Sequence, residues 1–223
     1  VDRDDGLDPE RADVLDVLGE VRHPGLDLGA HLGHVGLRLP VAAAMVALGA
    51  ALVDTDAIAR RLTSAGGAAM AALRGAFGTA IVAADGSLDR EAMRRLAFED
   101  AGARRRLEAV LHPMIGAQAL HEAAAAQAQV VVFDVPLLAE SSAWRQRVDR
   151  VVVVDCDVGT QLERVCTRPG WTRDTAERAI AAQAPRRARR AIADAVIHNV
   201  GIGLDELQSE VAALWRLWCA TDR

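Results

Sequence analysis

The sequence contains little cysteine, and this shortage excludes disulfide-rich and zinc-stabilised classes of protein. Its 223 residues include three cysteines, Cys156, Cys166 and Cys219, and no Cys-x-x-Cys pair. An odd number of scattered cysteines indicates neither a disulfide framework nor a structural zinc site. We therefore expect the protein to work in a reducing, cytoplasmic compartment.

An excess of basic charge and long apolar runs are also lacking. Lys and Arg total 26 against 31 Asp and Glu, a formal net charge of -5, so the charge pattern of a general nucleic-acid-binding protein is missing. The longest apolar run, 41–53, is shorter than the ~20 residues that span a bilayer, and the acidic opening of the sequence is unlike a signal peptide. We expect no nucleic-acid or membrane partner, and no feature indicates the oligomeric state.

The hydrophobic content, 51%, suits one sizeable α/β domain. Strands are predicted at 51–54, 130–136, 150–156 and, from a weaker pattern, 195–201. The runs VVVFDVP and RVVVVDC are typical of strands that are covered on both faces in a parallel sheet. Helices are predicted at 41–48, 56–63, 68–77, 89–98, 101–127, 158–168, 173–193 and 204–219. Strands that alternate with helices indicate a doubly wound α/β sheet.

Residues 1–40 differ from the rest of the chain. A charged opening is followed by GLDLGAHLGHVGLRLP, which has neither helical nor strand periodicity. We therefore separate an N-terminal segment, 1–40, in which no element is predicted, from a single domain that covers 41–223.

Three acidic residues follow predicted strands. Asp54 and Asp56 lie where a strand ends and a helix begins, and Asp134 ends the run VVVFD. Carboxylates at the carboxyl edge of a parallel sheet face the crevice where open α/β sheets bind ligands. Asp134 has the form of a Walker B residue, which delivers a carboxylate to the Mg²⁺ of a bound nucleotide. Helix capping is the simpler explanation for Asp54 or Asp56 taken alone.

Arginines are concentrated near the C-terminus of this acidic chain. They are Arg164, Arg168, Arg173, Arg186, Arg187, Arg189 and Arg190. Planar guanidinium groups pair with phosphate oxygens, so this cluster indicates polyphosphate binding. A solvated helix face is the alternative. His112 precedes Pro113 in a helical region, where we expect a bend or a new helix.

Several blocks occur in the order found in one enzyme family. LGAALVDTDAIAR, LHPMI, DVPLLAE, VDRVVVVDC and AAQAPRRARRAIADAVIHNVG resemble successive motifs of the dephospho-coenzyme A kinases, over residues 41–218. The resemblance implies a P-loop kinase fold, a three-layer sandwich around a parallel sheet, with a helical substrate-binding insertion at 64–127 and a lid at 164–190. It also implies transfer of the ATP γ-phosphoryl group to the 3′-hydroxyl of dephospho-coenzyme A, with Mg²⁺.

The resemblance also assigns site residues by motif position. Asp56 and Arg168 match catalytic positions, and Asp134 matches the Mg²⁺ position. Phosphate and nucleotide contacts are assigned to Gly33, Gly36, Arg38, Arg164, Arg173, Arg186, Arg189, Asn199 and Gly201. Substrate contacts are assigned to Asp54, His112, Pro136, Leu137 and Glu140.

The segment before Val41 departs from the family pattern. The family has GGIGSGKST there, whereas this chain has Leu37 at a glycine position, and Arg38, Leu39 and Pro40 in place of Lys, Ser and Thr. A phosphate-binding loop needs those glycines, the lysine and a hydroxyl for Mg²⁺. A frameshift is one interpretation, because GC-rich codons for HLGHVGLRL, read one base later, permit T-S-G-M-S-G-S-G; a sequence error or a true variant are the others.

Three functions therefore stay open. The chain is an active dephospho-coenzyme A kinase with an unusual loop, a catalytically impaired homologue that still binds coenzyme A-like molecules, or another small-molecule kinase of the same fold.

Overall fold

The structure is a computed structural model that describes residues 13–19, 38–135, 142–167, 170–181 and 183–219. Five parallel strands form one sheet in the order β2-β3-β1-β4-β5. They are β1 (Asp13–Gly19), β2 (Ala51–Asp54), β3 (Val130–Asp134), β4 (Arg150–Asp155) and β5 (Ala195–His198). The predicted α/β class with a parallel sheet is confirmed.

The central strand of the sheet comes from the segment in which no element was predicted. β1 pairs with β3 on one side and with β4 on the other. Its sequence, DVLDVLG, places Asp13 and Asp16 among apolar residues and fits no simple period. Pairing with a strand on each side, rather than local pattern, makes this segment a strand.

Helices cover both faces of the sheet. They are α1 (Arg38–Ala47), α2 (Thr55–Leu62), α3 (Met70–Phe77), α4 (Arg90–Glu99), α5 (Ala101–Ala125), α6 (Ser142–Arg145), α7 (Val158–Cys166), α8 (Arg173–Ala181), α9 (Arg186–Ala191) and α10 (Leu204–Cys219), with a 3₁₀ turn at Thr79–Ile81. Of the bend or new helix expected at Pro113, no new helix forms, because α5 continues through this proline. One expectation was wrong in detail, since the predicted helix 173–193 is divided into α8 and α9.

The valine-rich strands explain the layered core, because successive side chains on a strand face opposite sides. Val152 and Val154 of β4 pack in one cluster with residues of α1 and α10. Val151 and Val153 pack in a second cluster, which also contains Phe133 of β3 and buried residues of the helices between 55 and 125. The continuous valine runs are therefore buried on both faces, as predicted.

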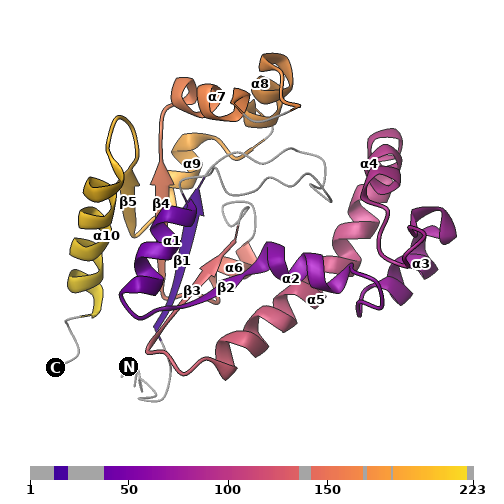
Figure 1. Cartoon of the computed structure of the whole chain (residues 1–223), viewed down its shortest axis with the longest axis horizontal. Helices are drawn as coiled ribbons and strands as arrows, with labels where there is room; N and C mark the ends of the chain where they lie inside the picture. The colour runs from indigo at the N-terminus through magenta and orange to yellow at the C-terminus, as the bar shows by residue number, and fades with distance from the viewer. Residues whose placement is uncertain (1–12, 20–37, 136–141, 168–169, 182, 220–223) are drawn as a thin grey trace, which may run out of the picture.

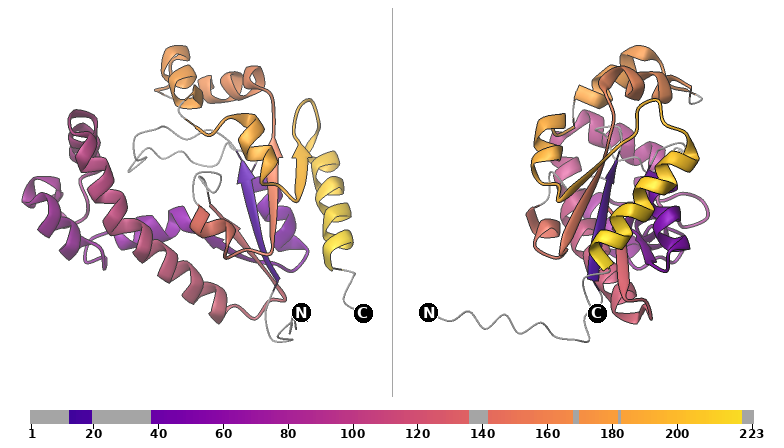
Figure 2. Two further views of the ribbon diagram at one scale, coloured as in Figure 1. Left: turned by 180° about the vertical axis from the view of Figure 1, so that it is seen from behind. Right: turned by 90° about the vertical axis from the view of Figure 1, so that its left-hand side faces the viewer.

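The remaining helices lie at two places around the sheet. In Figure 1, α3, α4 and much of α5 project to one side, and α7 and α8 lie beyond the carboxyl end of β4; the reverse view in Figure 2 shows the same arrangement. α7 and α8 share a small core of their own, built on Leu162, Val165 and Ala176. The projecting helices fall in the range expected for the insertion, and α7 to α9 overlap the range expected for the lid.

Candidate active site

Two carboxylates lie side by side at the carboxyl edge of the sheet. Asp54 ends β2, Asp134 ends β3, and the parallel pairing places the two residues opposite each other. Asp134 is buried, with 4% of its surface exposed. The hydroxyl of Thr55 donates to the main-chain oxygen of Asp134 at 2.8 Å, which ties the start of α2 to the end of β3. The sequence correctly placed both carboxylates at this edge.

Asp54 and Asp56, which form a D-x-D element with Thr55 between them, have different environments at the start of α2. One side-chain oxygen of Asp54 accepts hydrogen bonds from the backbone N–H groups of Asp56, at 2.8 Å, and Ala57, at 2.9 Å. Asp54 is thus the N-cap of α2, the simpler explanation noted above. Asp56 lies in the first helical turn and is half-buried, so its carboxylate is not the cap.

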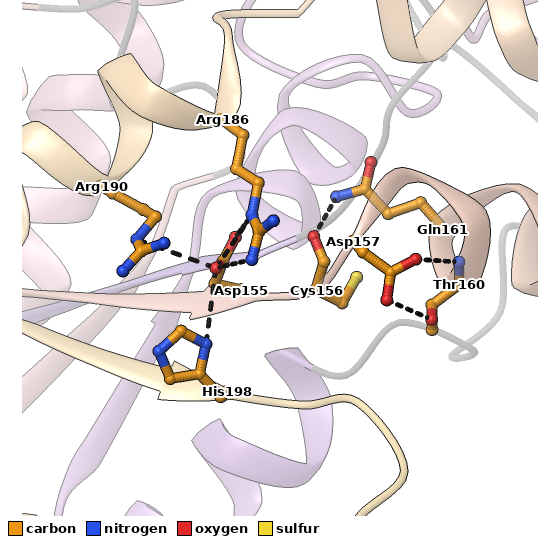
Figure 3. A network of polar contacts seen from close by, with 8 residues as sticks. All are labelled: Asp155, Cys156, Asp157, Thr160, Gln161, Arg186, Arg190 and His198. Atoms are coloured by element: carbon orange, nitrogen blue, oxygen red, sulfur yellow. Dashed lines mark hydrogen bonds and ion pairs between the residues drawn. The ribbon is translucent and has the colours of Figure 1, made fainter.

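A second polar cluster lies at the end of β4, around Asp155 (Figure 3). The side chain of Asp155 is 1% exposed and accepts from Arg186 through Nε, at 2.8 and 3.0 Å, and through Nη2, at 2.7 Å. Arg190 lies 3.9 Å and His198 Nδ1 lies 3.6 Å from the same carboxylate. The hydrogen bond to Asp155 raises the pKa of the Arg186 guanidinium.

Sequence reasoning did not single out Asp155. The available signal was the same one that identified Asp134, an apolar strand that ends in aspartate: RVVVVD for β4 and VVVFD for β3. Figure 3 also shows Asp157 capping α7 through Thr160, and Gln161 donating to the Cys156 carbonyl at 3.4 Å.

Those arginines assigned to phosphates that the structure describes have different partners. Arg186 is bound to Asp155, whereas Nη1 of Arg189 donates to the Ala184 carbonyl at 3.0 Å. Arg173 is an exposed residue at the start of α8 and pairs with Glu177 at 3.0 Å. Arg164 is half-buried in the last turn of α7.

The segment after β5 brings two further predicted residues to the same edge. Asn199 is buried, with 2% exposed, and its backbone N–H donates to the Asp155 carbonyl at 2.8 Å. Within the part of the chain that the structure describes, Asn199 Nδ2 has no hydrogen-bond partner. Gly201 follows with φ +69°, a conformation that favours glycine.

The remaining predicted residues are His112, Arg38 and a group outside the described structure. His112 is exposed on α5, and Arg38 is the first residue of α1. Gly33, Gly36, Pro136, Leu137, Glu140 and Arg168 lie outside the described residues.

The described residues do not form a metal site built from protein ligands alone. Over the described ranges no group of three or more His, Cys, Asp or Glu side chains could hold a metal ion. Among these same residues, no helix is both long enough and apolar enough to cross a membrane.

The sequence matches known proteins from α1 onward. The family model described as dephospho-CoA kinase matches residues 38–204. A dephospho-CoA kinase from Burkholderia thailandensis is 56% identical over 168 residues, which are 75% of this chain and 83% of that protein. The dephospho-CoA kinase from Albidiferax ferrireducens is 47% identical over 174 residues, which are 77% of this chain and 82% of that protein.

Solved structures agree at the level of the fold. The Thermus thermophilus protein TT1252 aligns with a TM-score of 0.74 and 27% identity, over 94% of this chain and 99% of that one. The dephospho-CoA kinase from Campylobacter jejuni aligns with a TM-score of 0.65 and 17% identity over the same shares. With the family model covering most of the chain and relatives near half identical, this chain belongs to the dephospho-CoA kinase family of phosphotransferases.

Proposed function

We propose that the chain transfers the γ-phosphoryl group of ATP to the 3′-hydroxyl of dephospho-coenzyme A and so completes coenzyme A. The observation that carries the proposal is the pairing of Asp54 with Asp134 at the carboxyl edge of the sheet, with Asp56 in the first turn of α2 directly after Asp54. A kinase of this kind needs a carboxylate for the acceptor hydroxyl and another for the metal that accompanies ATP.

Different residues act on the acceptor hydroxyl, on the phosphates of ATP and on dephospho-coenzyme A. Asp56 orients the acceptor hydroxyl or takes its proton, because Asp54 is engaged as the helix cap. Five arginines neutralise charge on the phosphates: Arg164, Arg168, Arg173, Arg186 and Arg189. Arg168 also stabilises the transition state of phosphoryl transfer. Gly33, Gly36, Arg38, Asn199 and Gly201 complete the ATP site. His112, Pro136, Leu137, Glu140 and Asp54 contact dephospho-coenzyme A.

The described carboxylates fit Mg²⁺ bound together with a nucleotide. Mg²⁺ retains waters and takes one or two carboxylates plus substrate phosphates, rather than a cage of protein ligands. One buried carboxylate at a strand end, Asp134, without a three-residue cluster in the described chain, suits that mode. Asp134 would hold the ion, which when bound neutralises charge that develops on the phosphates.

The cytoplasm is the compartment that we propose, with no nucleic-acid or membrane partner. None of the three cysteines, Cys156, Cys166 and Cys219, forms a disulfide in the described structure. A reducing compartment maintains such thiols.

One observation favours the second candidate, an impaired homologue that still binds coenzyme A-like molecules. α1 begins with Arg38, Leu39 and Pro40, the positions at which the family has Lys, Ser and Thr. Backbone N–H groups of the first helical turn form the anion site of a P-loop, and Pro40 has none to donate. α1 thus begins at the family position of the P-loop helix, but its first turn offers fewer backbone N–H donors to a phosphate.

Two measurements test the proposal. An assay of ADP release that depends on dephospho-coenzyme A measures turnover, and coenzyme A, whose 3′-position already carries phosphate, is the matched control. Calorimetry then compares the ligands, and we expect measurable dephospho-coenzyme A binding with weak ATP binding. Tight magnesium-ATP binding without any response to dephospho-coenzyme A would reject the assignment.

A further inference from the structure

Asp155 connects two elements that are both assigned to ATP. Its side chain holds Arg186 at the start of α9, and its carbonyl accepts the backbone N–H of Asn199 at 2.8 Å. α9 and the segment after β5 are therefore held in position by one residue at the end of β4. Neither the family resemblance nor the strand pattern assigned Asp155 to the site.

The geometry of the ion pair leaves part of the arginine available. A guanidinium carries five N–H donors, on Nε, Nη1 and Nη2. Asp155 takes donors from Nε and Nη2, and within the described residues Arg186 Nη1 has no hydrogen-bond partner. The side chain of Arg186 is 39% exposed, whereas that of Asp155 is 1% exposed. Arg186 can thus keep its bond to the carboxylate and still donate to an anion from Nη1.

Two guanidinium groups lie at the carboxyl end of β4, where open α/β sheets bind ligands. Asp155 faces the fixed positive charges of Arg186 and Arg190, with His198 Nδ1 3.6 Å away. Asp157, two residues further on, is engaged with the N–H and hydroxyl of Thr160 at the start of α7. Arg186 and Arg190 therefore balance the charges of Asp155 and Asp157, so directed N–H donors, rather than net charge, would hold an anion at this place.

We propose that Asp155 is a positioning residue for ATP: its carboxylate fixes the Arg186 guanidinium with Nη1 left for a phosphate oxygen, and its carbonyl fixes the segment that carries Asn199. This rests on the proposed function, because ATP is the anion that Arg186 serves. A bidentate bond to a buried carboxylate restricts the guanidinium plane, so the arginine loses less freedom when it binds phosphate.

Substitution of the buried partner gives the first test. Asp155→Asn keeps the shape and removes the charge, and the affinity for magnesium-ATP should fall about tenfold or more, because a misplaced phosphate contact is costly. The KM for dephospho-coenzyme A should stay within about twofold, since a change confined to ATP binding leaves the acceptor site intact. Calorimetry and steady-state kinetics measure both, in the full chain and in the full chain with residues 31–40 replaced by TGGIGSGKST.

The exposed partner provides the second test if Asp155→Asn folds poorly. Arg186→Lys keeps the charge but cannot form the bidentate bond, so it should weaken ATP binding by a similar factor. The double variant should be no worse than either single one, because the two residues act as a unit. Asp157→Asn is the matched control: it removes a carboxylate two residues away and should leave ATP affinity unchanged.

The outcomes separate a positioning role from a merely structural one. If Asp155→Asn lowers the unfolding temperature but leaves ATP affinity unchanged in a background that binds ATP, Asp155 only anchors α9 and the proposal is wrong. Equal weakening of ATP and dephospho-coenzyme A would also reject it, as would an absence of ATP binding in both backgrounds. A different result would contradict the proposed function: ATP binds, but neither the full chain nor the chain with the replaced loop phosphorylates dephospho-coenzyme A.

Discussion

At the scale of single residues, the D-x-D element shows how adjacent carboxylates receive different tasks. Asp54 accepts two backbone hydrogen bonds at the start of α2, and Arg60 approaches it at 3.6 Å. Asp56, two positions further on, lies inside the first turn and cannot make the same cap. The carboxylate that is not used for capping is the better candidate for chemistry at the acceptor hydroxyl.

Asp56→Asn should therefore lower turnover far more than it weakens ATP binding. A carboxylate that orients or deprotonates an acceptor contributes roughly 10²- to 10⁴-fold to the rate. The comparison is made in the chain with a restored loop, by steady-state kinetics and ATP titration. Asp89→Asn is the control, since Asp89 caps α4 outside the assigned site residues and asparagine also caps helices well. Near-full turnover of Asp56→Asn would mean that Asp56 has no catalytic role.

Asp100, which caps α5, should make stability dependent on acid pH. Its hydrogen bond from the Gly102 N–H, at 2.7 Å, and then its bond to Arg106 hold the pKa of Asp100 below its usual range. Because the folded-state pKa is lower than the unfolded one, the stabilisation is present above the unfolded pKa and is lost as pH falls through the folded one.

Asp100→Asn should consequently flatten the fall in unfolding free energy between about pH 5 and about pH 3, because asparagine keeps the cap without titrating. Urea titrations at several pH values measure this. Glu206→Gln, which removes an exposed charge from α10, controls for net charge. Identical pH profiles for the native chain and Asp100→Asn would contradict the prediction.

The positions of site residues were predictable only where local sequence decides them. Asp54 and Asp134 follow from the rule that strand ends meet at one edge, and the structure places them opposite each other. The partner of Asp155 is 31 positions away in the chain, on a helix that follows two others. Such a pairing depends on tertiary packing, which no local pattern encodes.

At the scale of elements, strong and uniform patterns were reliable. β3 and β4 begin at the predicted residues, 130 and 150, and α10 has the predicted bounds, 204–219. β1 was missed because DVLDVLG interrupts its apolar residues with aspartates, and only its two neighbouring strands make it a strand. Of the two outcomes expected at Pro113, a bend or a new helix, the structure excludes the new helix, because α5 runs through the proline to Ala125.

The turn between α2 and α3 offers a prediction about backbone packing. A Cβ atom at Gly67 would lie 2.7 Å from the Arg61 carbonyl oxygen and would also clash with the Leu62 carbonyl, both of which belong to the backbone. Gly67→Ala should therefore destabilise the fold by ~1–3 kcal/mol, as overpacking does. Gly75, which is exposed within α3 with open space around it, is the matched site.

Gly75→Ala should stabilise the protein by ~0.5–1 kcal/mol, since alanine is favoured over glycine inside helices. Urea unfolding of both variants gives the comparison. Equal effects at the two sites would show that the α2–α3 turn adapts freely and that the clash is relieved at no cost.

At the scale of the whole molecule, the match to the family model begins within the segment before Val41 that departs from the family's P-loop pattern. The match begins at residue 38, where α1 begins, and the central strand ends at Gly19. Residues 20–37 connect the two. The alternating strands and helices predicted the sheet and the resemblance predicted the family, but neither could show how the chain continues from the central strand into α1.

Replacement of residues 31–40 with TGGIGSGKST should convert a feeble or inactive protein into an efficient kinase. Phosphoryl transfer depends chiefly on positioning and on stabilising charge over the transferred group, and this loop supplies both. The replacement restores the glycines that let backbone N–H groups converge, the lysine, the hydroxyls and the N–H that Pro40 lacks. Loss of even one preorganised donor costs a rate factor of ~10² to 10³, so the gain should exceed that of any other single repair.

The loop replacement is measured by dephospho-coenzyme A-dependent ADP release on both chains, side by side. The loop variant should bind magnesium-ATP more tightly and turn over faster, while its affinity for dephospho-coenzyme A stays close to the original, because the acceptor residues follow α1 in the chain. Equal, substantial rates would show that Arg38, Leu39 and Pro40 never limited the enzyme. Equal absence of activity would place the defect upstream, where β1 and residues 20–37 must deliver the loop to the sheet edge that carries Asp134.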